Sequence, residues 1–292
     1  MRFFGFGLLS LTGCRMLLGS PRKVATLHPL LTDLARQGGG ERVEVIDLIG
    51  PNGDPHHFEP NAEDLKKATG ARLYLAAGLG LEAYLPALKS LVPPGTRVIE
   101  TGASLPLLHG GCEDPSHNHD DHEIDPHWWH SIDRFRRATT VVAEAFAKED
   151  PEDAETFRSN AARYRETLDE LESWARVRLA TIPKNQRQLA TTHAAFNYFC
   201  SDFGFAAFPI QGINREQSPS PVELAKLIAE LKGKNVAAIF PEKESNPKLL
   251  EVLTRDTGIR LGNPLIADGT NSATYETMVR SNVETIVTGL TR

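Results

Sequence analysis

The chain has 292 residues, of which 40% are hydrophobic and 24% charged, and its formal net charge is −6. This composition is ordinary for a soluble globular protein, and the length suggests two domains that can each bury a core. Because no strongly basic region is apparent, the composition argues against nucleic acid as a partner.

The N-terminus reads as a secretion signal. Met1-Arg2 supplies a positive charge, and the apolar run over residues 3–11 is too short to span a membrane as a mature helix. The run ends in Leu11-Thr12-Gly13-Cys14, which resembles a bacterial lipobox, in which the cysteine is lipidated and becomes the first mature residue. We therefore expect residues 1–21 to be a signal peptide and lipoprotein anchor region. A chance cysteine after an apolar start is the alternative.

The next segment alternates predicted strands with predicted helices. Strands are predicted over residues 23–27, 42–49, 72–77 and 96–100, and helices over 30–36 and 61–69. This βαβα rhythm is typical of a mainly parallel sheet covered by helices. It predicts an N-terminal α/β lobe over residues 22–150.

Two helices are predicted in the middle of the chain. Ser131 can cap a helix that runs to about residue 148, and Asp150 can cap a second helix over residues 151–182. The second helix has apolar residues at steps of three and four, namely Phe157, Ala161, Tyr164, Leu168, Leu171, Trp174 or Ala175, and Leu179. At 1.5 Å per residue it is about 45 Å long. We interpret it as a strut between two lobes; a long surface helix of one domain is the alternative.

The strand and helix rhythm resumes after Pro183. Strands are predicted over residues 188–192, 206–210 and 236–240, and helices over 221–232, 248–257 and 282–290. This pattern predicts a C-terminal α/β lobe over residues 183–292. The expected fold is therefore two α/β lobes with mainly parallel sheets, joined by one long bridging α-helix over 151–182.

Residues 109–122 form a biased segment with four histidines and almost no apolar side chains. Such a composition predicts a mobile loop. Its histidines can bind metal weakly and raise the local metal concentration, or the loop can be a solvated spacer, and the sequence leaves both possibilities open.

Three other histidines lie at predicted element boundaries. His56 and His127 each end an Asp-Pro-His motif, at residues 54–56 and 125–127, and His193 ends a predicted strand. Ligands of open α/β sheets bind outside the carboxyl ends of the strands. Neutral imidazoles that converge there suit zinc, copper, iron or nickel, and a carboxylate completes a four-coordinate site.

Each of these histidines also has a simpler interpretation. A single histidine at an element boundary is more often a capping or exposed residue than a ligand. The repeated Asp-Pro-His motif favours metal binding, because proline restricts the backbone before each histidine and the aspartate can orient the imidazole. An exposed Asp-Pro turn is the alternative for each motif.

Three motifs together resemble the zinc and manganese solute-binding proteins of bacterial ABC importers. They are Gly53-Asp54-Pro55-His56-His57-Phe58-Glu59-Pro60, Asp125-Pro126-His127-Trp128 and Thr192-His193-Ala194-Ala195-Phe196-Asn197-Tyr198-Phe199. The resemblance covers nearly the whole mature chain. It implies that His56, His127 and His193 are metal ligands, and that the fold is two α/β lobes bridged by one long helix.

The resemblance also implies a carboxylate ligand. Ala267-Asp268, upstream of residues 274–279, is similar to the family loop that supplies it, so Asp268 is the expected fourth ligand. The sequence between these two segments departs from commoner versions of the family. Phe240-Pro241-Glu242 is similar to another family segment, and Glu242 is not counted among the direct ligands.

The resemblance implies a receptor rather than an enzyme. The expected protein is a monomer, lipid-anchored through Cys14 in the periplasm or at the outer face of the cytoplasmic membrane, that delivers a divalent metal ion to an ABC transporter permease. Three imidazoles favour Zn²⁺, and Mn²⁺ is the alternative, although manganese-selective members often have Glu at the position of His193.

Two further functions remain as alternatives at this point. A zinc hydrolase needs a nearby general base, for which Glu59 is the nearest acidic candidate, but the chain has no His-Glu-x-x-His pattern. A surface adhesin is compatible with a lipid anchor. The pairing of Cys112 and Cys200 is also open, because their spacing does not show whether they form a disulfide or stay free.

Overall fold

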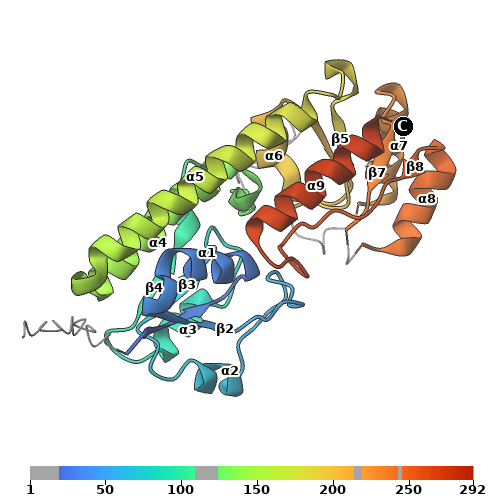
Figure 1. The fold of residues 1–292 in the computed structure, drawn as a ribbon. Helices are drawn as coiled ribbons and strands as arrows, with labels where there is room; N and C mark the ends of the chain where they lie inside the picture. Colours follow the sequence, from blue (N-terminus) through green and yellow to red (C-terminus); the bar gives the residue numbers. More distant parts are fainter. Residues whose placement is uncertain (1–19, 109–123, 214–218, 243–244, 292) are drawn as a thin grey trace, which may run out of the picture.

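The computed structural model describes residues 20–108, 124–213, 219–242 and 245–291 (Figure 1). Each half of the chain forms a lobe with a four-stranded parallel sheet, and one long helix, α5, runs past both lobes. The predicted fold class is confirmed. The lipobox at Cys14 and the histidine-rich segment 109–122 lie outside the described residues.

The N-terminal sheet has the strand order β2-β1-β3-β4, and every pairing is parallel. Val24 in the central strand is level with Val45 on one side and Leu73 on the other. Its strands are β1 (Arg22–Thr26), β2 (Val43–Asp47), β3 (Leu73–Ala76) and β4 (Arg97–Glu100). In this order the chain passes from one side of β1 to the other after β2, which makes the carboxyl end of β1 a topological switch point.

Short helices connect these strands. They are α1 (Pro29–Gly39), α2 (Ala62–Lys67) and α3 (Leu85–Leu91). Helix α2 begins with a capping box, because Asn61 accepts from the backbone N–H of Asp64 while the Asp64 carboxylate accepts from that of Asn61. The sequence prediction missed α3, which has only seven residues and therefore little helical periodicity.

The C-terminal sheet repeats the same parallel arrangement with the order β6-β5-β7-β8. Its strands are β5 (Gln188–Thr191), β6 (Ala206–Pro209), β7 (Ala238–Phe240) and β8 (Arg260–Leu261), and its helices are α6 (Asn197–Phe203), α7 (Pro221–Gly233), α8 (Pro247–Thr257) and α9 (Tyr275–Leu290). The closing helix α9 starts at Tyr275, seven residues before the predicted start, because Thr274 caps it by accepting from the Thr277 N–H.

Helices α4 (Ile132–Glu149) and α5 (Ala154–Leu179) pack along each other on one side of the molecule (Figure 1). Helix α5 has 26 residues, hence a length of about 39 Å, and contacts both α1 and α9. The predicted apolar stripe is its buried face. The predicted cap at Asp150 is wrong: its carboxylate accepts from Arg22 Nε at 2.8 Å, and Pro151–Asp153 form a 3₁₀ turn before α5.

The hydrophobic core is continuous from one lobe to the other. A single cluster of buried side chains includes Leu34 of α1, Phe135 of α4, Leu168 of α5 and Ile286 of α9. Full burial of one such side chain stabilises the fold by about 1.5–3 kcal/mol. Separating the lobes would therefore expose core side chains, so the arrangement opposes wide hinge motion.

Short 3₁₀ turns complete the structure, and two of them matter for the site. They are η1 (Gly40–Arg42), η2 (Thr101–Ser104), η3 (Trp128–His130), η4 (Pro151–Asp153), η5 (Lys184–Gln186) and η6 (Ala194–Phe196). His127 directly precedes η3 and His193 directly precedes η6. Each turn thus starts from a histidine that the sequence analysis singled out.

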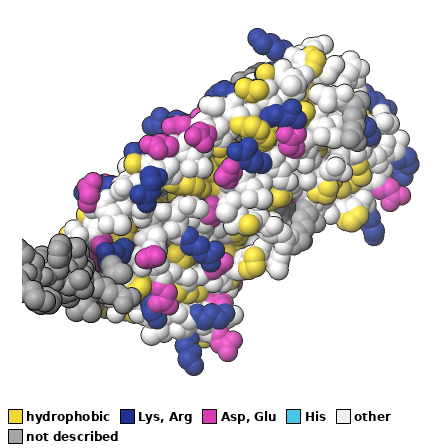
Figure 2. All heavy atoms as spheres, in the orientation of Figure 1, with side chains coloured by type: hydrophobic (Ala, Val, Ile, Leu, Met, Phe, Trp, Pro, Cys, Tyr) yellow, Lys and Arg dark blue, Asp and Glu magenta, His cyan; other side chains and the backbone are white. Residues whose placement is uncertain are grey.

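The visible surface carries interspersed cationic and anionic side chains with small apolar areas between them (Figure 2). No broad area of one charge sign covers this face. Within the described residues, no helix has the length and apolar character needed to cross a membrane.

Candidate metal centre

The four predicted ligands meet between the two lobes. The ligand atoms of His56, His127, His193 and Asp268 all lie within 4.8 Å of one another. His56 follows β2, His127 precedes η3, His193 follows β5, and Asp268 lies between β8 and α9. Four loops that are far apart in the sequence therefore supply one side chain each.

The spacing of these atoms suits a four-coordinate ion. The Nε2 atom of His127 is 3.3 Å from the Nε2 atoms of both His56 and His193, and His56 Nε2 is 3.6 Å from Asp268 Oδ1. A tetrahedral zinc ion with bonds of 2.0–2.1 Å separates its ligand atoms by about 3.4 Å. The cluster has the dimensions of such a coordination shell.

Asp125 orients the imidazole of His127. Its Oδ1 atom accepts from the His127 backbone N–H at 2.9 Å and lies 2.8 Å from Nδ1 of the ring. Asn197 donates to the other carboxylate oxygen at 3.1 Å, and Asp125 is fully buried. A proton on Nδ1 that points to Asp125 leaves the Nε2 lone pair facing the cluster, and burial lowers the pKa of His127, which favours this neutral form.

Glu242 does the same for His193 from the C-terminal lobe. Its Oε1 accepts from the His193 backbone N–H at 3.1 Å, and its Oε2 makes a hydrogen bond with Nδ1 of the ring. Glu242 lies just after β7 and is buried. It is not one of the four clustered residues; it contacts His193 at the ring nitrogen that points away from the cluster. Such carboxylate partners fix the tautomer of metal-binding histidines.

The first Asp-Pro-His motif makes the same backbone contact as the second. Asp54 Oδ1 accepts from the His56 backbone N–H at 2.9 Å, which matches the contact from Asp125 to His127. His56 itself is almost covered, with 6% of its side chain exposed, whereas the neighbouring His57 is exposed. The repeated motif therefore reflects a repeated turn that presents a histidine at the lobe junction.

The electrostatics of the cluster favour a cation. The tautomers set by Asp125 and Glu242 direct the Nε2 lone pairs of His127 and His193 towards each other at 3.3 Å, next to the carboxylate of Asp268. Electron-rich atoms packed this closely in a buried space repel one another unless a positive charge lies between them. Imidazole nitrogens with one carboxylate are the donors that borderline divalent metals prefer.

Two further histidines near the cluster were missed by the sequence analysis. His28 and His130 are buried beside Trp129, and burial lowers the pKa of each to about 3, so both are neutral. Their Nε2 atoms have no hydrogen-bond partner among the described residues. His28 follows the carboxyl end of β1, and ligands of open α/β sheets bind outside the carboxyl ends of strands. The same criterion that indicated His193 could therefore have indicated His28.

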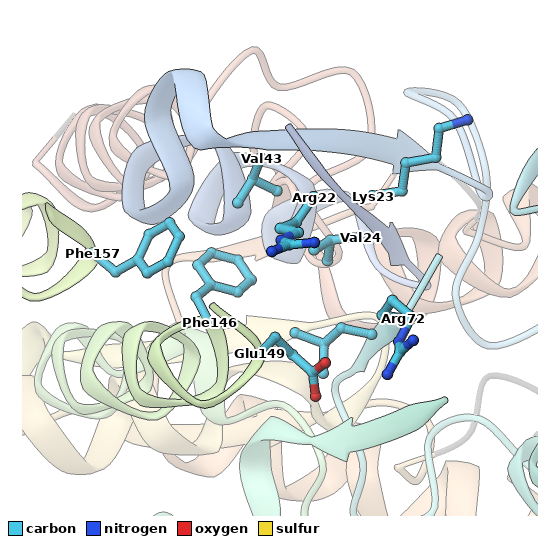
Figure 3. Close-up of a pocket in the computed structure, with 9 residues that line it drawn as sticks. Arg22, Lys23, Val24, Val43, Arg72, Phe146, Glu149 and Phe157 are labelled. Carbon is cyan, nitrogen blue, oxygen red and sulfur yellow. The ribbon is translucent and has the colours of Figure 1, made fainter. Parts of the chain in front are cut away.

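A separate cavity of about 190 Å³ lies at the amino ends of the strands of the N-terminal sheet, whereas His56 follows the carboxyl end of β2 (Figure 3). It is lined by the first residues of β1 and β2, including Arg22 and Val43, and by Phe146 and Phe157 from α4 and α5. The two phenylalanine rings lie side by side in an edge-on contact on one side of the cavity in Figure 3, with their centroids 5.5 Å apart. None of the four clustered ligand residues lines it, so it is not part of the metal centre.

Comparison with known proteins decides the family. The family model described as "Zinc-uptake complex component A periplasmic" matches residues 24–289, which is most of the chain and includes all four clustered residues. The chain belongs to this family. Family members are metal-binding substrate receptors of ABC importers and not enzymes, so the hydrolase alternative is wrong.

Individual relatives are named for different metals. The chain is 29% identical to the manganese-binding lipoprotein MntA of Bacillus subtilis, over 98% of this chain and 96% of the relative. It is 30% identical to the zinc-binding lipoprotein AdcA of Streptococcus pneumoniae, over 83% of this chain and 49% of that longer protein. The periplasmic zinc-binding protein TroA of Treponema pallidum has the same fold, with a TM-score of 0.83, 27% identity, and coverage of 94% of this chain and 100% of TroA.

Proposed function

We propose that this chain is an extracytoplasmic zinc receptor that delivers Zn²⁺ to the permease of an ABC importer. In this proposal His56, His127, His193 and Asp268 are the direct ligands, and the ion is cargo that is bound and released. The observation that carries the proposal is the convergence of three imidazole Nε2 atoms and one carboxylate at distances typical of a tetrahedral shell.

Zinc is favoured over manganese by the chemistry of these donors. Three neutral imidazoles and one carboxylate suit zinc, whereas manganese tolerates more oxygen ligands, and zinc also exceeds manganese in the Irving–Williams order. Asp125 and Glu242 are the hydrogen-bond partners of Nδ1 in His127 and His193, so that Nε2 of each ring faces the cluster. A manganese receptor is the second candidate, because the relative MntA is named for manganese.

The position of the receptor in the cell is part of the proposal. We propose that residues 1–21 are a signal peptide and anchor region, and that lipidated Cys14 holds a monomeric receptor at the outer face of the cytoplasmic membrane or in the periplasm. The relatives MntA and AdcA are named as lipoproteins, which supports this assignment. The proposed domain limits remain 22–150 and 183–292, with the bridging segment at 151–182.

Metal analysis of the protein purified from its native envelope tests the proposal. We expect about one equivalent of zinc per chain and little manganese. A competition titration of the metal-free protein should then show that zinc displaces manganese from the same site. If the native protein carries manganese and zinc does not displace that manganese, the manganese receptor is supported instead. Protein that binds neither ion tightly would refute the proposed ligand set.

A further inference from the structure

The segment that carries Asp268 is hydrogen-bonded first to the C-terminal lobe and then to the N-terminal lobe. Up to Ile266 the segment is bound to the C-terminal lobe. The Leu265 N–H donates to the Pro241 carbonyl at 2.9 Å. Buried Asn282 of α9 holds both backbone groups of Ile266, accepting from its N–H at 2.9 Å and donating to its carbonyl at 2.8 Å.

From Ala267 onward, contacts bind the same segment to the opposite side of the site. Trp129 Nε1 donates to the carbonyl of Ala267 at 2.7 Å, directly before Asp268. The Asn271 N–H donates to the Pro51 carbonyl at 2.8 Å, in the loop that presents His56. Asp268 therefore lies where the chain passes from contacts with one lobe to contacts with the other.

The backbone just after Asp268 is shaped for this crossing. Gly269 has φ +74°, and a Cβ atom at this position would come within 2.6 Å of the Leu30 side chain in α1. Thr270 Oγ1 donates to the Gly53 carbonyl at 3.3 Å, and Asn271 has φ +60°. A tight turn thus seats the downstream half of the segment on the N-terminal lobe.

Trp129 is itself held rigidly next to His127. It is the second residue of the η3 turn, it is 1% exposed, and its ring centroid lies 5.3 Å from that of His127. On its other side it contacts the ring of His28 at 4.4 Å, and the Tyr275 hydroxyl donates to the Trp129 carbonyl at 2.8 Å. One short turn therefore delivers both a histidine of the cluster and the hydrogen bond that holds the Asp268 segment.

We infer that Trp129 is the positioning residue that keeps Asp268 against the three imidazoles and thereby sets the rate of metal release. This inference rests on the proposed metal-binding function. His127 and His193 have their own carboxylate partners in the lobes that carry them, whereas the peptide unit before Asp268 is tied across the site by the Trp129 indole. Rupture of this hydrogen bond lets Asp268 withdraw and opens one coordination position while the imidazoles stay in place.

The continuous core explains why a loop carries this motion. Because α5 packs against elements of both lobes, wide separation of the lobes would expose side chains such as Leu168 and Ile286. Among the described residues, withdrawal of the Asp268 segment breaks the hydrogen bonds that Ala267, Thr270 and Asn271 make with the N-terminal lobe. Local loop movement is therefore the less costly path for the ion to leave.

Trp129→Phe tests the inference by removing the indole N–H while keeping an aromatic ring. Loss of the donor leaves the buried Ala267 carbonyl without this partner, and we expect zinc to dissociate about tenfold faster. The rate is measured by stopped-flow mixing of the zinc-loaded protein with a chromophoric chelator. Trp128→Phe is the matched control, because Trp128 is equally buried in the same turn but its indole donates to the Ala77 carbonyl, so its rate should change less than twofold.

A double-mutant cycle separates positioning from a general structural effect. If Trp129 acts through Asp268, Trp129→Phe should have no further effect in an Asp268→Ala background. The Co²⁺-loaded Trp129→Phe variant should also show a changed visible absorption band, because its coordination shell is altered. Thr270→Val, which removes a different bond of the same segment, should accelerate release in the same direction if Trp129→Phe does not fold.

The outcomes distinguish the two levels of the proposal. Equal rates for wild type and the folded Trp129→Phe variant would overturn the role of Trp129, as would an undiminished effect in the Asp268→Ala background. A wild-type protein that holds neither Zn²⁺ nor Co²⁺ would instead overturn the proposed function.

Discussion

Replacing Glu242 with Gln removes a carboxylate that supports the proposed metal centre without being one of its four clustered residues. Glu242 receives two hydrogen bonds from His193, one from the backbone N–H at 3.1 Å and one from Nδ1 of the ring, and its side chain is 1% exposed. Glutamine has a similar shape but only one acceptor oxygen. One of the two His193 donors must then face the amide NH₂ group.

Both arrangements of the new amide weaken zinc binding. If the NH₂ group faces the ring, Nδ1 must accept, and the ring proton moves to Nε2, where it competes with the metal. If it faces the backbone, a buried N–H loses its partner. Loss of such supporting contacts costs about 10–100-fold in metal affinity, or about 1.4–2.7 kcal/mol. His193→Ala, which removes the ligand itself, should lower zinc affinity by a larger factor.

A competition titration against a zinc-binding chromophore at pH 7 measures the effect. Glu59→Gln is the matched control, because Glu59 is an exposed carboxylate three residues after His56 and the substitution makes the same change in charge. We expect its affinity to stay within about twofold of wild type, within the range of ordinary surface substitutions. A Glu242→Gln protein that is folded and binds zinc as tightly as the Glu59→Gln control would refute the role assigned to Glu242.

Two further predictions concern other parts of the chain. Deletion of residues 109–122 should leave one tight zinc site per chain by calorimetry, because the four clustered ligands lie elsewhere; loss of that site would show that the segment supplies a direct ligand. Buried His130 should make the metal-free protein sensitive to acid, because burial lowers its pKa from 6.5 to about 3 in the folded state. Below pH 6.5 the unfolded chain binds a proton at this histidine that the folded protein does not bind, so the free energy of unfolding falls as the pH is lowered from 6.5 towards 3. Between pH 8 and pH 4, His130→Phe should therefore lose about 3 kcal/mol less unfolding free energy than wild type in urea titrations, and equal losses in the two proteins would contradict this cause.

The sequence predicted the secondary structure well where the elements carry a local signal. The buried stripe of α5 from Phe157 to Leu179 follows the spacing of its apolar residues, and Ser131 caps α4 as expected. The prediction failed where that signal is weak. Strand β8 has only two residues, both exposed, and the first turns of α9 carry polar residues such as Thr277 and Arg280.

The candidate site was predictable to a similar degree. The Asp-Pro-His motifs indicated His56 and His127 because their aspartates make short-range hydrogen bonds to the backbone two residues later. The resemblance drew attention to the segment of Glu242 but did not predict its contact with His193. That contact joins residues that follow two different strands, and no local sequence pattern indicates a contact of this kind. Asp268 was indicated mainly by resemblance, since its loop has no motif of its own.

The sequence by itself determined the alternation of strands and helices, the apolar face of α5 and the turns that present the histidines, because each depends on interactions within a few residues. Only the tertiary structure decided that four loops converge with ligand atoms within 4.8 Å of one another, and that Trp129 ties the Asp268 segment across the site. These features depend on how two sheets pack against one bridging helix. Contacts between residues far apart in the chain are set by that packing and leave no periodic trace in the sequence.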